Sequence, residues 1–163
     1  MKKILAIAIV SALSPAFASA AEFDQSKLYA GGSLTNNVVD SPFGGGSASA
    51  IGFAGFAGYE LDNNFGDVTT SIEAGYSTTD DFYSGFDSDI SGLWVAGVVQ
   101  KTLDEINPQL FAIARLGLDL GDDDGLLMGA GAGFQLNEQL DLRAEFINKD
   151  ASSVYQVSAV FNF

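Results

Sequence analysis

The last nine residues of the sequence, 155-YQVSAVFNF-163, alternate strictly between two kinds of side chain. An extended strand has a side-chain period of two, so this segment would present two different faces. One face would carry the apolar residues Tyr155, Val157, Ala159, Phe161 and Phe163. The other would carry Gln156, Ser158, Val160 and Asn162. A strand with five apolar positions on one face needs an apolar environment outside it, which a water-exposed edge strand lacks.

Seven earlier segments repeat this pattern of apolar residues at every second position. We expect these strands at about residues 27–34, 49–61, 65–77, 90–101, 110–120, 126–136 and 140–148. Residues 110–120 have the clearest frame, with Leu or Ala at all six alternate positions from Leu110 to Leu120 and with Arg115 on the opposite face. Both faces of 90–101 are apolar. We choose the frame that places Leu93, Val95 and Val99 outward and Trp94 inward.

Each of these segments is long enough to cross the hydrocarbon of a bilayer as a tilted strand. Backbone groups in hydrocarbon must all find partners, so the strands have to close on one another. The sequence therefore predicts an all-β fold, an eight-stranded antiparallel up-and-down transmembrane β-barrel. We expect short turns near 62–64, 104–108 and 137–139, and loops at 35–47, 78–89, 121–125 and 149–152. Candidates for aromatic girdles at the membrane interfaces are Tyr29, Tyr59, Phe65, Tyr76, Phe134, Phe161 and Phe163.

The first twenty residues have the features of an export signal. Lys2 and Lys3 precede a ten-residue apolar stretch, 4-ILAIAIVSAL-13, and Ala18-Ser19-Ala20 is a small-x-small cleavage motif. The apolar stretch is too short for a membrane-spanning helix. We expect a Sec signal peptide at 1–20, cleaved before Ala21 or, as second choice, before Glu22, and a barrel domain at 21–163.

Composition excludes several classes of function. Five basic residues remain beyond the signal against 21 acidic ones, a net charge of about −16. Nucleic acid is therefore not an expected partner, because phosphate binding needs Lys and Arg. The sequence has no Cys and no His, so thiol nucleophiles and Ser–His or Asp–His arrangements are absent. Glu60 and Glu73 are the fallback acid–base pair, without further support. We expect no enzyme activity and no cofactor.

Several motifs give the sequence a family resemblance. They are Ala57-Gly58-Tyr59-Glu60-Leu61, Ile72-Glu73-Ala74-Gly75-Tyr76, Ala114-Arg115-Leu116-Gly117 and Leu142-Arg143-Ala144-Glu145-Phe146. With the terminal Phe163, they resemble the OmpA-like, small porin-like eight-stranded outer-membrane barrels. The resemblance implies location in the bacterial outer membrane, with lipid and lipopolysaccharide around the barrel. It also implies periplasmic chaperones and the barrel-assembly machinery as partners, with Tyr155, Phe161 and Phe163 as the assembly signal.

Inward charges form the main candidate site. The resemblance places Glu73 and Arg143 where a lumen-plugging pair lies in this family, whereas Val98 and Gly133 occupy the positions of its alternative partners. We expect a salt-bridge network of Glu60, Glu73, Arg115, Arg143 and Glu145, with Asp141 as a further candidate. Such pairing satisfies charges that would be costly to bury alone. The same residues could instead line a conducting path.

Acidic loops are the second candidate site. Asp122, Asp123 and Asp124 form a run that could bind Ca²⁺ weakly, although it lacks the spacing of a calcium loop. Residues 78–89 combine four Asp with Phe82, Tyr83 and Phe86, which could contact a surface receptor or phage. A solvated acidic loop is the simpler interpretation.

We therefore expect an integral outer-membrane protein with a structural or surface-interaction role and a largely plugged lumen. One alternative is a small nonspecific channel. Another is a soluble secreted β-sandwich or lipocalin-like binder, in which the apolar faces would form an internal core.

Overall fold

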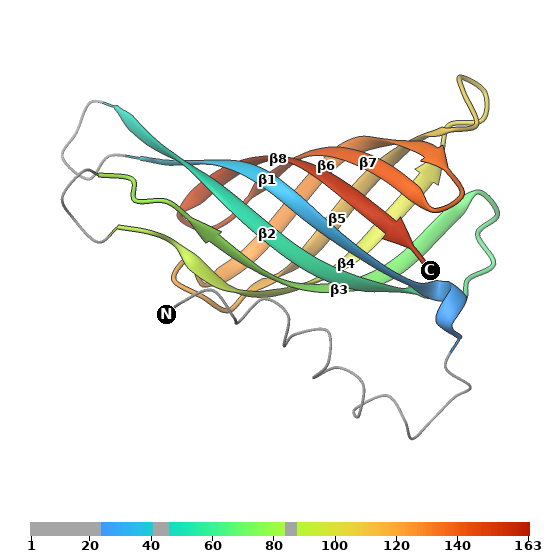
Figure 1. Ribbon diagram of the computed structural model, residues 1–163, viewed down its shortest axis with the longest axis horizontal. Coiled ribbons are helices and arrows are strands. Elements are labelled where there is room, and N and C mark those ends of the chain that lie inside the picture. The colour runs from blue at the N-terminus through green and yellow to red at the C-terminus, as the bar shows by residue number, and fades with distance from the viewer. Residues whose placement is uncertain (1–23, 41–45, 84–87) are drawn as a thin grey trace.

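Eight consecutive strands wind once around a closed barrel, each hydrogen-bonded to the next, and β8 returns to pair with β1 (Figure 1). The computed structural model describes residues 24–40, 46–83 and 88–163. The strands are β1 (Leu28–Asp40), β2 (Ser47–Leu61), β3 (Val68–Thr79), β4 (Ser91–Thr102), β5 (Leu110–Asp119), β6 (Gly125–Asn137), β7 (Leu140–Asn148) and β8 (Ser152–Asn162). The predicted up-and-down barrel is confirmed. The expected signal peptide, Ala18, Ala20, Phe86 and Asp87 lie outside the described residues.

Side chains on the outside of the barrel are apolar, as the alternation predicted. Leu116 and Val157 are 57% and 58% exposed, whereas Arg115 and Ser158, one position away, are buried. The chosen frame of β4 is also confirmed, since Leu93, Val95 and Val99 are exposed and Trp94 is buried. The described residues contain no helix that is long and apolar enough to cross a bilayer.

The sandwich or lipocalin-like alternative is wrong. A sandwich consists of two packed sheets, but here one sheet closes on itself, and a lipocalin-like binder would keep its apolar face inside. Large apolar side chains instead cover the outer surface, and the interior contains Ser, Thr, Asn, Glu, Arg and Asp side chains. A surface of this kind is stable only in an apolar solvent such as lipid.

Two strands differ in length from their expected ranges. β1 continues to Asp40, through a stretch that we expected to be a loop, because its backbone pairs with both β2 and β8 up to Val39. β3 begins at Val68, three residues later than expected. Phe65 remains in the preceding turn, next to Gly66, whose φ of 70° lies in the left-handed region that glycine adopts readily.

The interior contains both polar and apolar side chains, and most of the buried apolar ones form two groups. One apolar group contains Val98, Phe111 and Ile113. A larger apolar group contains Tyr29, Phe56, Trp94, Ala96, Leu127, Ile147, Val154 and Val160. The buried charged residues lie among these groups, and β3, β5 and β7 supply the charged residues that meet at the centre.

Candidate functional site in the barrel lumen

Four charged side chains meet in the middle of the lumen, and we call them the central cluster: Glu73, Arg115, Arg143 and Glu145. Each faces inward because its strand alternates, and each is at most 5% exposed. Arg115 Nε and Nη2 donate to the two Glu145 oxygens, both at 2.8 Å. Arg143 Nη1 donates to Glu73 Oε1 at 2.6 Å.

Glu73 joins the two arginines into one network. Its second oxygen, Oε2, lies 3.0 Å from Arg115 Nη1, so each carboxylate oxygen faces a different guanidinium. Two positive and two negative charges balance within the cluster. Removal of one member would leave a buried charge without its partner, which typically costs about 3–5 kcal/mol.

Neutral side chains complete the cluster. Tyr29 Oη donates to Glu73 Oε1 at 2.9 Å and lies 2.7 Å from Ser71 Oγ. Gln156 Nε2 donates to Glu145 Oε2 at 2.9 Å. The prediction that Tyr29 belongs to an aromatic girdle is wrong. The alternation of the first strand could have shown this, because Tyr29 is next to the outward residue Leu28 and therefore faces the lumen.

Aromatic rings lie against both arginines. Arg143 Cζ is 5.2 Å from the centre of the Tyr29 ring, and Arg115 Cζ is 5.6 Å from the Trp94 ring. Such cation–π contacts stabilise a guanidinium at a place where water is scarce. Arg143 Nε is buried and has no hydrogen-bond partner among the described residues, and its guanidinium also lies 6.0 Å from the Phe56 ring.

Glycines provide the space that these long side chains occupy. A Cβ at Gly58 would lie 2.2 Å from Tyr29 Cζ, and one at Gly129 would lie 2.9 Å from Arg115 Cγ. At Gly131, a Cβ would lie 2.1 Å from the Ala144 carbonyl oxygen and 2.9 Å from Glu145 Cγ. The abundant inward glycine therefore lets a narrow barrel hold arginine and tyrosine side chains.

Two further candidates lie outside the central cluster. Glu60 is half-buried on β2 and makes none of the ion pairs found within residues 24–40, 46–83 and 88–163. Asp141 is buried on β7, where its Oδ2 accepts a hydrogen bond from Asn162 Nδ2 at 3.2 Å. Neither carboxylate forms an ion pair with Arg115 or Arg143 of the central cluster.

The acidic run after β5 is engaged with the protein itself. Asp122 Oδ2 accepts hydrogen bonds from Ser91 N and Oγ. Asp123 Oδ1 accepts from Ala151 N at 2.8 Å, and Asp123 is only 3% exposed. Within the described part of the chain, no three acidic side chains converge in a way that could hold a metal ion.

Sequence comparison decides the family. The model of the outer membrane protein β-barrel domain matches residues 4–163. The chain belongs to this family. Membership places this outer membrane β-barrel protein in the bacterial outer membrane, in contact with its lipid. No curated protein sequence matches the chain.

Solved structures support the fold of this outer membrane β-barrel protein. Neisserial surface protein A is similar over 85% of the chain and 98% of its own length, with 15% identity and a TM-score of 0.56. The Yersinia pestis outer membrane protein Ail, in a phospholipid bilayer nanodisc, is similar over 83% and 99%, with 15% identity and a TM-score of 0.54. A de novo designed transmembrane β-barrel matches over 86% and 98%, with 17% identity and a TM-score of 0.60. At such low identity, these likenesses concern the fold alone.

Proposed function

We propose that this protein is a structural and surface-interaction component of the outer membrane, with a lumen closed to ions. The observation that supports this proposal is the central cluster. Glu73 and Arg143 span from β3 to β7 at 2.6 Å, and Arg115 joins them from β5. Ions crossing the barrel would have to separate these buried pairs, which is costly.

The test is single-channel recording of the refolded wild-type barrel in a planar bilayer. We expect no conductance steps. As a control for folding, unboiled protein recovered from the bilayer lipid should migrate as a folded barrel on an SDS gel. Steady wild-type steps would instead support a small nonspecific channel. That second candidate rests on the polar lining that β1 and β8 provide, which includes Ser33, Thr35, Asn37, Gln156 and Ser158.

Export and assembly belong to the same proposal. We expect a Sec signal peptide, cleaved before Ala21, and delivery by periplasmic chaperones to the barrel-assembly machinery. The assembly signal would be the outward aromatics of β8, Tyr155 and Phe161, together with Phe163 directly after that strand. Tyr155 and Phe161 are 56% and 44% exposed, and the Phe161 and Phe163 rings pack edge to face at 5.4 Å. N-terminal sequencing of the mature protein tests the cleavage site.

Surface interaction would involve the outer end of the barrel and a receptor, phage or lipopolysaccharide. Asp119, Asp122 and Asp123 are engaged by groups of this chain, so a ligand would have to use other acidic side chains there, such as Asp124 and Asp150. The charge at this end disfavours anionic ligands unless cations accompany them.

A further inference from the structure

A second group of buried polar residues lies between the central cluster and the outer mouth, and we call it the outer cluster: Asp119, Asp123, Lys149 and Ser152. Lys149, in the loop between β7 and β8, donates from Nζ to Asp119 Oδ2 at 2.6 Å. Their side chains are only 9% and 3% exposed. Asp119 Oδ1 accepts a hydrogen bond from Gly121 N, so both oxygens of this carboxylate are engaged.

Asp123 fixes the chain that carries Lys149. Its carboxylate accepts hydrogen bonds from Ala151 N and from Ser152 Oγ. The end of β5 and the loop after it are thereby joined to the segment between β7 and β8 and to the first residue of β8, by one ion pair and two hydrogen bonds. These contacts restrain Lys149, whose long side chain would otherwise be free to extend into water.

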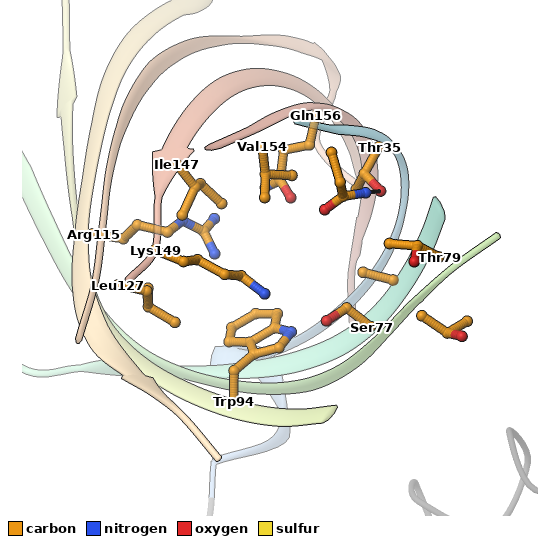
Figure 2. A pocket seen from close by; sticks show the side chains of 13 residues that line it. Thr35, Ser77, Thr79, Trp94, Arg115, Leu127, Ile147, Lys149, Val154 and Gln156 are labelled. Atoms are coloured by element: carbon orange, nitrogen blue, oxygen red, sulfur yellow. Dashed lines mark hydrogen bonds between the residues drawn. The ribbon is translucent and has the colours of Figure 1, made fainter. Parts of the chain in front are cut away.

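The outer cluster lies in series with the central cluster. Asp119 follows Arg115 by four residues on β5, and Lys149, the first residue after β7, follows Glu145 by four residues. Four residues of strand correspond to about 13 Å. A cavity of about 30 Å³ touches both clusters, because its lining includes Arg115 of the central cluster and Lys149 of the outer cluster, together with Trp94, Thr35 and Gln156. Figure 2 shows the Lys149 side chain extending from the barrel wall into the lumen toward the Trp94 ring.

We propose that the lumen is closed twice, by the central cluster and again by the Lys149–Asp119 pair near the outer mouth. The cavity that touches both clusters has room for one or two water molecules, and the polar groups of Thr35, Lys149 and Gln156 in its lining can bind them. This inference extends the proposed closed lumen. It assigns to Lys149 and to the acidic segment 119–123 a role in closure, in place of calcium or ligand binding.

Trp94 reports on the outer closure directly. It is the sole tryptophan of the sequence, it is 8% exposed, and it pairs in register with Asp119 on the neighbouring strand. Quenching of its fluorescence by acrylamide, a small neutral molecule, therefore measures access from the outer mouth. We expect Lys149→Ala to raise the quenching constant several-fold over the wild type. Asp119→Asn, which removes the charge that holds the lysine, should raise it less.

Lys101→Ala is the matched control, because Lys101 lies on β4 with a side chain that is 59% exposed outside the lumen. It makes the same chemical change and should leave quenching of Trp94 unaltered. If folded Lys149→Ala and Asp119→Asn barrels both gave the quenching constant of this control, the outer closure would be wrong. A heat-shifted band on an SDS gel identifies folded barrels. Lys149→Met, which keeps the side-chain length without the charge, replaces the alanine variant if that variant does not fold.

Conductance tests whether the closures act in series. We expect Glu73→Ala/Arg143→Ala alone and Lys149→Ala/Asp119→Ala alone to give few or brief openings. The four substitutions together should give steady steps. If the Glu73→Ala/Arg143→Ala barrel conducted as well as the fourfold variant, the second closure would be refuted while the proposed plug remained. A conducting wild-type barrel would refute the plug itself. In that case, quenching of Trp94 would still test the outer closure separately.

Discussion

Glu73 is fully buried at the centre of the barrel, and its two oxygens face two different arginines. A buried carboxylate in a narrow lumen is stable only when its charge is compensated. Here, two guanidinium groups and the Tyr29 hydroxyl provide that compensation. At the scale of single residues, stability therefore depends on the balance of the cluster more than on any one contact.

Arg143→Met tests this balance. We expect it to lower the free energy of unfolding by about 3–5 kcal/mol, because Glu73 loses the partner at 2.6 Å. The double variant Arg143→Met/Glu73→Gln should lose less than Arg143→Met alone, since Arg115 and Glu145 still balance each other. Urea unfolding in lipid vesicles, followed by Trp94 fluorescence, gives both values. If the loss of unfolding free energy in the double variant equalled the sum of the losses in the two single variants, the idea of a charge balance would be wrong.

β6 shows how a strand can be adapted to a crowded interior. Its inward positions Gly129, Gly131 and Gly133 face Arg115, Glu145 and Phe111 from neighbouring strands. Its outward positions Met128 and Leu126 remain apolar and exposed. Glycine weakens an ordinary strand, but in this strand it makes room for the central cluster. The residue types of β6 are therefore set by contacts inside the barrel as well as by the surrounding membrane.

Gly131→Ala is expected to destabilise the barrel by about 1–3 kcal/mol, as overpacked interiors do. The new Cβ would lie 2.1 Å from the Ala144 carbonyl oxygen, and backbone cannot move aside cheaply. Gly55→Ala is the matched control, because Gly55 faces outward and its Cβ would have no atom within 4 Å. Urea midpoints of the two variants should differ clearly. Equal midpoints would show that β6 has spare room inside.

The whole barrel exposes large apolar side chains on its outside, whereas its interior combines buried charged and polar groups with two apolar groups. Its first and last strands close the sheet, and Phe163 N donates to Leu28 O at 3.1 Å. Every strand therefore has two neighbours, and no long edge faces lipid. This arrangement is stable only when hydrocarbon surrounds the apolar band.

Leu116→Arg should lower stability in a bilayer by about 2–4 kcal/mol, the usual cost of a charge on the lipid face near the midplane. Leu116 is 57% exposed and lies well inside β5. Ser49→Arg, at an exposed polar position near the outer end of β2, should cost far less. Unfolding in vesicles of matched lipid compares the two. A similar cost for both would contradict the location of the apolar band.

The sequence predicted strand frames better than strand ends. Within the apolar band, the contrast between alternate residues is strong on most strands, so Leu116 and Arg115 could be assigned to opposite faces. Beyond that band the contrast disappears. Thr35 to Asp40 therefore resembled a loop, although their backbone pairs with β2 and β8. Tyr29 was misassigned for a different reason. Aromatic residues at strand ends occur both in girdles and inside barrels, so residue type alone did not identify its face.

By itself, the sequence predicted the eight-stranded closed barrel and most of the residues that face lipid, because a period of two in hydrocarbon leaves one frame for each strand whose two faces differ. It also marked Glu73, Arg115, Arg143 and Glu145 as inward charges. Only the tertiary structure decided which charges meet. Partners such as Glu73 and Arg143 are 70 residues apart, and their contact depends on strand register and tilt around the closed barrel. The outer pair of Lys149 and Asp119 depends in addition on how the loop that carries Lys149 folds over the end of β5, which alternation does not encode.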